Sequence, residues 1–121
     1  METTNHLFVH CAFTMGVWNA LMRWLGFSFL PQPNLFRHWI CWSVAASNNR
    51  LRKGYRMIWH AAVWSIWRAR NDRIFNYTIA EVEEIVEAVK VLSWRWTLSH
   101  LKVSACLFYE WCWNPKECLL R

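Results

Sequence analysis

Apolar residues dominate one stretch in the middle of the chain. Between Met57 and Trp67 only His60 and Ser65 are polar, and basic residues flank this stretch on both sides. A helix that is apolar on nearly every side belongs in the centre of a bundle or in a membrane. The stretch is far shorter than the roughly 20 apolar residues that a membrane span requires. The pattern therefore predicts a buried central helix over about Leu51–Phe75 and no membrane span.

Two helices are predicted before the central one, from their apolar spacing and their capping residues. The first covers about Met15–Leu25, with Thr14 as its N-cap and Gly26 in the left-handed conformation that ends a helix. The second begins after Asn34 and ends near Ala46. Its apolar residues are expected to point inward, and they are Leu35, Phe36, Trp39 and Ile40.

A fourth helix is predicted to reach about His100. Thr78 and Glu81 have the spacing of a capping box, and Tyr77 and Val82 have the spacing of a hydrophobic staple. The expected apolar stripe of this helix consists of Val82, Ile85, Val86, Val89, Leu92 and Trp96. The aromatic tail that follows, LFYEWCWNPKECLLR, is predicted to be short or irregular in structure because its apolar residues keep no helical period and a proline interrupts it.

Composition agrees with a helical protein. The chain has 121 residues, 55% of them hydrophobic, and 11 tryptophans, which excludes a disordered chain. Three glycines and three prolines supply few turns for a many-stranded sheet. We therefore predict an all-α fold: a small irregular bundle of about four helices, formed by residues 15–121 as one domain after a loop-like segment 1–14. Most tryptophans must lie in the core, and Trp111 and Trp113 in the tail are the best candidates for exposure.

Charge is spread unevenly over the chain, whose formal net charge is +6. Up to Ile79 there are nine Lys or Arg against two acids, and from Ala80 onward there are five against six. A basic half of this kind attracts RNA, DNA or another anionic surface without sequence specificity. The candidate nucleic-acid-binding residues are Arg52, Lys53, Arg56, Arg68, Arg70 and Arg73. The alternative is a solvated helix end whose arginines pair with Asp72 or with the cluster Glu81–Glu87 and lie along tryptophan faces.

The five cysteines form an odd set without a CxxC pair, and no signal-peptide pattern is visible at the N-terminus. Reduced thiols in an intracellular protein are therefore expected, with nucleus or cytoplasm left open, and disulfides are not. His6 and Cys11, in the segment HLFVHC, are zinc-ligand types, but a structural zinc site needs four ligands. From spacing alone, a hydrogen-bonded histidine and a buried cysteine are the favoured interpretation. A site completed by Cys106, Cys112 and Cys118 is the weaker alternative to simple packing of these cysteines.

Catalysis has no support in the sequence, and we predict that the chain is not an enzyme. The acids are concentrated at the start of one helix, where capping explains them, and a two-metal site needs carboxylates from separate elements. A glycine-rich phosphate loop is absent. His60, in the apolar stretch, is interpreted as a hydrogen-bonded core residue.

Three segments, HLFVHC, WSIWRARNDRIF and FYEWCWNPKECL, together resemble a known family. The resemblance is to the reverse-transcriptase zinc-binding domain in the C-terminal region of plant LINE-type (non-LTR) retroelement polyproteins. The family pattern is a CxxC, an acidic residue and HLFxxC, and Glu2, His6 and Cys11 match its last part. The resemblance implies a zinc site made of Cys, Cys, His and Cys, of which this chain carries only half.

This resemblance implies an N-terminally truncated fragment without the polymerase, and we expect no stable zinc site, no cofactor and no catalysis. Nonspecific nucleic-acid binding is the activity expected to remain. The alternative is a helical module that binds a protein partner, or a second copy of itself, through a tryptophan-rich surface. A relic without function is a third reading.

Overall fold

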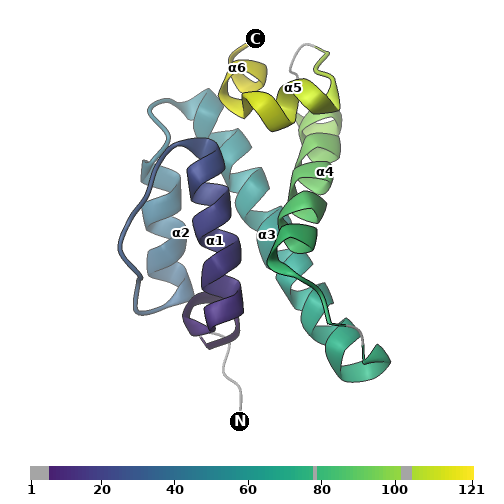
Figure 1. Cartoon of the computed structure of the whole chain (residues 1–121). Helices are drawn as coiled ribbons and strands as arrows, with labels where there is room; N and C mark the ends of the chain where they lie inside the picture. Colours follow the sequence, from purple (N-terminus) through teal and green to yellow (C-terminus); the bar gives the residue numbers. More distant parts are fainter. Residues whose placement is uncertain (1–5, 78, 102–104) are drawn as a thin grey trace.

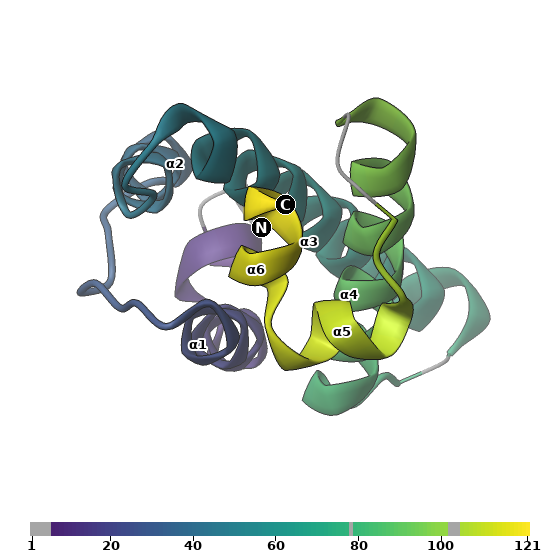
Figure 2. The same ribbon diagram turned by 90° about the horizontal axis from the view of Figure 1, so that it is seen from above.

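The computed structural model describes residues 6–77, 79–101 and 105–121, and within these ranges the chain forms helices and no strand. Helix α2 packs against the long helix α3, α4 runs along α3 and also contacts α1, and α5 and α6 close one end (Figures 1 and 2). The elements in order are a π-helical turn η1 His6–His10, then α1 Ala12–Leu25, α2 Leu35–Val44, α3 Asn49–Asn76, α4 Val82–His100, α5 Phe108–Trp113 and α6 Pro115–Leu120. The all-α bundle predicted from the sequence is confirmed, with two additional short helices in the tail.

The central helix predicted over Leu51–Phe75 is confirmed as α3, which contacts α2, α4 and α6. Asn48 caps it by accepting a hydrogen bond from the Leu51 backbone N–H at 2.9 Å. Only its first two thirds are buried, through residues such as Ile58 and Ala62. Towards its C-terminal end α3 buries only one face: Ser65 and Ile66 are buried, whereas Trp64 and Trp67 are exposed. The prediction of a helix buried on every side is wrong for this part, because the neighbouring helices cover only the face that carries residues such as Ser65 and Ile66.

A loop was predicted for residues 1–14, but the described part, residues 6–14, is largely helical and packed. Phe8 in η1 is buried, and its carbonyl accepts a hydrogen bond from the Trp18 indole at 2.6 Å. Thr14 does not cap a helix, since α1 begins at Ala12 and the Thr14 hydroxyl donates to the Leu7 carbonyl at 2.6 Å. This buried bond ties η1 to α1. At the other end of α1, Gly26 has the predicted left-handed conformation, with φ 83°.

Helix α2 shows a different buried face from the predicted one. Asn34 caps it as expected, accepting from the Arg37 N–H at 2.8 Å. However, Phe36 is 68% exposed, and His38 and Trp42 are buried in its place. The inward face includes polar groups because each finds a partner: the Trp42 indole donates to the Tyr55 carbonyl at 2.7 Å, and the Trp59 indole donates to His38 Nδ1 at 3.0 Å. These indole bonds fasten α2 to α3.

Helix α4 begins after Glu81, whose backbone N–H donates to the Glu84 carboxylate at 3.3 Å. Thr78, the predicted cap, lies outside the described residues. Tyr77 is 89% exposed, so the predicted staple with Val82 does not form. The predicted apolar stripe is confirmed in its central part, where Ile85, Val86 and Val89 are buried. None of the described helices is long and apolar enough to span a membrane.

The tail forms two short helices that pack on the bundle, where irregular structure was predicted. Trp111 is fully buried, and its indole donates to the Ser93 hydroxyl at 3.3 Å, so the prediction of exposure is wrong for this residue. Trp113 is 87% exposed, as predicted. Leu119 in α6 is also fully buried and packs against Gly54 of α3. The tail therefore closes the end of the core (Figure 2).

Candidate functional site

The two candidate zinc ligands lie at the junction of η1 and α1. His6 is the first residue of η1 and Cys11 is the N-cap of α1, and the Cys11 N–H donates to the His6 carbonyl at 2.9 Å. Both line a cavity of about 550 Å³ between η1, the start of α1 and the end of α3, which we call the amino-terminal pocket. In the described part of the chain no three His, Cys, Asp or Glu residues come together to hold a metal ion. Two candidate ligands do not fit a tetrahedral zinc site.

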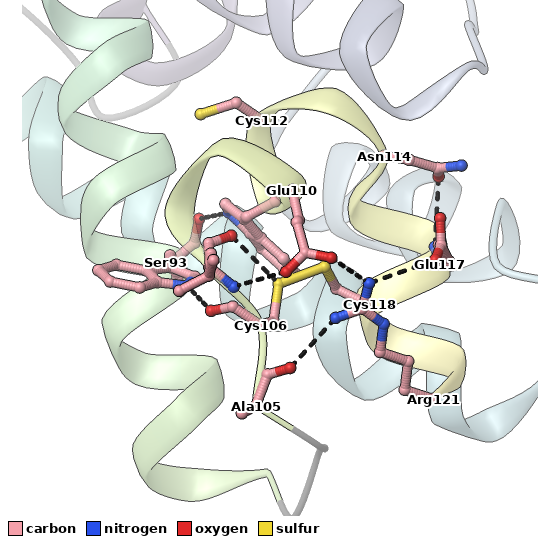
Figure 3. The surroundings of a disulfide bond; sticks show 12 residues. Ser93, Ala105, Cys106, Glu110, Cys112, Asn114, Glu117, Cys118 and Arg121 are labelled. Carbon is pink, nitrogen blue, oxygen red and sulfur yellow. Dashed lines mark hydrogen bonds and ion pairs between the residues drawn. A yellow bond between two sulfur atoms is a disulfide. The ribbon is translucent and has the colours of Figure 1, made fainter.

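Cys106 and Cys118 form a disulfide, which contradicts the expectation of reduced thiols (Figure 3). Their Cα atoms lie 6.0 Å apart, within the range of about 4.4–6.8 Å that a disulfide needs. Both residues are buried, and the bridge joins the segment before α5 to α6. Cys112 stays free, with its pKa raised mainly by burial, so these three cysteines do not converge into a metal site.

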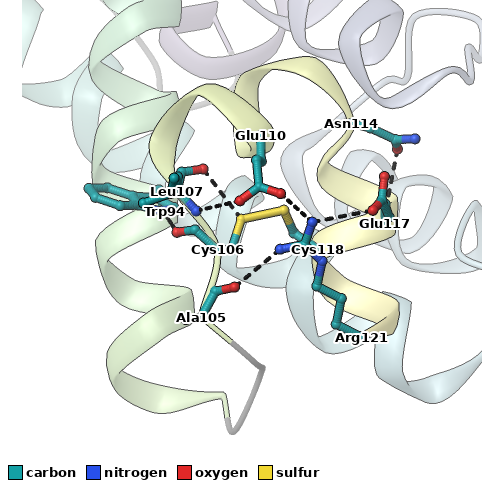
Figure 4. Close-up of polar contacts among 9 residues, drawn as sticks. All are labelled: Trp94, Ala105, Cys106, Leu107, Glu110, Asn114, Glu117, Cys118 and Arg121. Atoms are coloured by element: carbon teal, nitrogen blue, oxygen red, sulfur yellow. Dashed lines mark hydrogen bonds and ion pairs between the residues drawn. A yellow bond between two sulfur atoms is a disulfide. The ribbon is translucent and has the colours of Figure 1, made fainter.

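An ion-pair network surrounds this disulfide (Figures 3 and 4). The Arg121 guanidinium pairs with the Glu110 carboxylate and, at 3.2 Å, with Glu117, and it donates to the Ala105 carbonyl at 3.1 Å. The hydrogen bond from Arg121 is the main reason why the pKa of Glu110 is lowered. The disulfide and the ion pairs together connect the segment before α5 to α6. We therefore interpret this cluster as one that stabilises the fold of the tail.

The six candidate nucleic-acid residues fall into two groups on α3. In the first group, the Arg52 side chain donates to the Ser43 carbonyl and the Arg56 side chain donates to the Ser43 hydroxyl, both at 3.2 Å. The Arg56 guanidinium also lies over the Trp39 ring, 5.1 Å from its centroid. Lys53 between them is exposed. Arg52 and Arg56 thus help to hold α2 against α3 and are only partly available to a ligand.

The second group, Arg68, Arg70 and Arg73, lies on the C-terminal part of α3. Arg68 lies on one side of α3 and lines a surface hollow. We call this hollow the acidic pocket, because Asp72, Glu84 and Glu87 also line it. Arg70 and Arg73 line the amino-terminal pocket on the other side. The structure therefore does not bring the six basic residues together into one patch.

Exposed aromatic residues accompany this second group. The Trp64 and Trp67 rings stack with centroids 5.2 Å apart and an interplanar angle of 28°. Further along, Phe75 and Tyr77 are exposed. We call Trp64 together with residues 67–77, which include the C-cap Tyr77, the exposed end of α3. Sequence reasoning assigned these tryptophans to the core. The alternation of arginine with apolar residues after Trp67, which breaks the helical apolar period, was the available signal of exposure.

His60, which was predicted to be a core histidine, is not the histidine that the fold buries. His60 is exposed and packs its ring against Trp39, with centroids 5.3 Å apart; partial burial lowers its pKa. The buried histidine is His38, whose pKa is lowered to about 4 by burial. His38 is therefore neutral at pH 7 and accepts the indole hydrogen bond from Trp59. His38 therefore stabilises the contact between α2 and α3. No pattern in the surrounding sequence predicted that this histidine would be buried.

Comparison of the chain with known protein families, curated proteins and solved structures finds no match.

Proposed function

We propose that this chain corresponds to the C-terminal part of the zinc-binding region of a plant LINE-type reverse-transcriptase polyprotein, and that it binds nucleic acid without sequence specificity and without catalysis. The observation that supports binding most directly is the exposed end of α3. It presents the stacked Trp64–Trp67 pair beside Arg68, with Arg70 and Arg73 on its other side. Proteins that bind single strands combine exposed aromatic rings, on which bases stack, with arginines that contact phosphates.

The neighbours of each arginine favour one side of the exposed end for phosphate contact. Arg68 shares the acidic pocket with three carboxylates, which lower the local positive potential. The described lining of the amino-terminal pocket contains Arg70 and Arg73 and no acidic residue. We therefore expect Arg73 to contribute more to affinity than Arg68, with the tryptophans stacking on bases.

The test is fluorescence anisotropy of a labelled single-stranded RNA, titrated with protein at several salt concentrations. The slope of log K against log salt is negative, and each lost phosphate contact makes it less steep by about 0.7 for single strands. The double variant Arg70→Ala/Arg73→Ala should reduce the steepness of this slope by roughly 1.4 if both arginines contact phosphate. Arg37→Ala, an exposed arginine on α2, is the matched control and should change little. Absence of detectable RNA and DNA binding at about 50 mM salt would reject the proposal.

A second candidate function is supported by the apolar character of the same region. Phe75, Tyr77 and Ile79 are all more than two-thirds exposed, and clustered exposed apolar side chains mark protein interaction surfaces. In this alternative the chain docks a protein partner or a second copy of itself there. Light scattering coupled to size exclusion separates the two candidates: a tight dimer that Phe75→Ser dissociates, without nucleic-acid affinity, supports the second.

A further inference from the structure

We propose that a small pocket between α1, the loop of residues 27–34 and α2 binds a neutral, single-ring aromatic molecule that carries a carbonyl oxygen. We call it the His38 pocket, after the buried histidine in its wall. The loop returns along α1 before α2 begins (Figure 1), and it contributes Phe29, Pro31 and Gln32 to the wall. The described lining contains no residue assigned to nucleic-acid contact, so the site is independent of the proposed function.

His38 supplies this pocket with a hydrogen-bond donor in a fixed direction. The residue is 4% exposed, and its Nδ1 accepts a hydrogen bond from the Trp59 indole at 3.0 Å. An indole nitrogen can only donate, so the proton of the neutral His38 ring is on Nε2, which points away from Trp59. Trp18 and Phe29 hold the imidazole in place, with ring centroids 4.3 Å and 5.1 Å from its own.

The Nε2–H group of His38 has no acceptor in the described part of the chain. It is not sealed inside the core either, since Thr97 Oγ1 is the one side-chain polar atom that the described residues enclose without a partner. The group therefore faces open space, and the His38 pocket is a space that this histidine lines. A donor left unpaired in apolar surroundings is costly, so a ligand that brings an acceptor is favoured.

The size and the walls of the pocket suit an aromatic ring. Its volume of about 170 Å³ is close to the roughly 150 Å³ of an apolar cavity that binds benzene. Met15, Trp18 and Met22, spaced i, i+3 and i+7, lie on the face of α1 that lines it. Thioethers and indole rings both make favourable contacts with aromatic rings. A flat ring with one oxygen matches these walls better than water, which needs two to four polar partners.

The pocket offers no counter-charge to an ionic ligand. Its described lining includes no acid, lysine or arginine, and its polar side chains besides His38 are Asn19 and Gln32. Burial lowers the pKa of His38 to about 4, so the imidazole is neutral at pH 7. An ion that entered would lose its hydration without gaining a partner of opposite charge. The expected ligand class is therefore a neutral aromatic carbonyl compound.

The test is heteronuclear NMR spectroscopy of the full chain, titrated at pH 7 with acetophenone. We expect saturable shifts of two indole N–H signals, because Trp18 lines the pocket and Trp59 donates to His38. α-Methylstyrene has a methylene group in place of the carbonyl oxygen and nearly the same shape. It should bind at least about fivefold more weakly, because it leaves Nε2–H unpaired. Benzoate, which is charged, should show no saturable binding.

Two variants separate the volume of the pocket from its donor. Met15→Trp fills part of the pocket and should weaken acetophenone binding by at least about tenfold. Met57→Trp, at a half-buried methionine of α3 outside the described lining, is the matched control and should leave the affinity unchanged. His38→Phe should abolish the preference for acetophenone over α-methylstyrene.

The dispersion of the NMR spectrum shows whether each variant is folded, and Met15→Trp keeps the test decisive if His38→Phe unfolds. Absence of saturable acetophenone binding would overturn the proposal. Equal affinities of the wild type for acetophenone and α-methylstyrene, or benzoate binding as tight as that of acetophenone, would overturn it too. The same holds for a folded Met15→Trp protein that binds acetophenone as tightly as the wild type.

Discussion

Adding one methyl group at Gly54 should destabilise the fold, although alanine is the better helix former. Gly54 lies in α3 directly under α6. A Cβ atom built at this position would lie within 3.0 Å of three side-chain carbons of Leu119. Leu119 is fully buried and adjoins Cys118, whose disulfide to Cys106 restrains α6, so the leucine has little room to move away.

The expected magnitude follows from two opposing effects. Glycine to alanine in a helix interior stabilises by about 1 kcal/mol, whereas forcing extra carbon into a packed core costs about 1–3 kcal/mol. Because the added Cβ would crowd three carbons of Leu119, we take the upper part of that cost, about 2–3 kcal/mol, so Gly54→Ala should lower the free energy of unfolding by about 1–2 kcal/mol. Leu119→Ala alone should lower it by about 2–5 kcal/mol, because it leaves a cavity. In the double variant the new methyl group occupies part of that cavity. The double variant should therefore lose less stability than the sum of the losses in the two single variants.

Urea unfolding of the wild type, both single variants and the double variant, followed by far-UV circular dichroism, measures these differences. Gly16→Ala on α1 is the matched control, since a Cβ there would meet its nearest neighbour, a Val82 methyl, at 3.3 Å. This control should cost far less than Gly54→Ala. A Gly54→Ala protein as stable as wild type, or strictly additive losses in the double variant, would refute the close packing of α6 on α3.

Two further predictions concern the disulfide and the buried histidine. The Cys106–Cys118 bridge spans a sequence separation of 12, so its reduction should lower the free energy of unfolding by about 3 kcal/mol. Unfolding of the wild type with and without dithiothreitol measures this difference, after thiol titration has verified that the bridge is reduced. The double variant Cys106→Ala/Cys118→Ala is the control, because dithiothreitol should not change its stability. A wild-type unfolding midpoint that stays the same after reduction would contradict the prediction. Burial lowers the pKa of His38 from 6.5 to about 4, so the unfolded chain binds more protons between these values. Stability should therefore fall as pH decreases from about 6.5 to 4, by up to about 3 kcal/mol, and His38→Gln should remove most of this slope. His60→Gln is the comparison, because the pKa of His60 is also lowered; a wild-type stability that is flat over this range would refute the buried neutral state.

Features that depend on a few neighbouring residues were predictable. Gly26 ends α1 and Asn34 begins α2 because a left-handed φ and a side-chain cap are properties of the local backbone. The apolar stripe of α4 was also predictable, since the period of the helix places Ile85 and Val89 on one face. The all-α class and the central position of α3 follow from such local signals together with the apolar content.

Positions that depend on which helix lies opposite were not predictable. The buried face of α2 includes His38 and Trp42 because α3 offers Trp59 as a donor and the Tyr55 carbonyl as an acceptor, while Phe36 finds no neighbour. Similarly, Trp64 is exposed although it lies in the apolar stretch, because it faces a surface hollow that it lines with residues of α4.

The candidate sites show the same division. The sequence named His6, Cys11 and the arginines of α3 as chemically capable, since residue type alone indicates that. The fold decided that Arg70 and Arg73 share a pocket with His6 and Cys11 while Arg68 joins an acidic neighbourhood. It also decided that Cys106 meets Cys118, through the turn between α5 and α6. Local sequence sets each helix and its chemistry, but only packing between distant segments determines which side chains meet, because burial and pairing depend on neighbours that no local pattern contains.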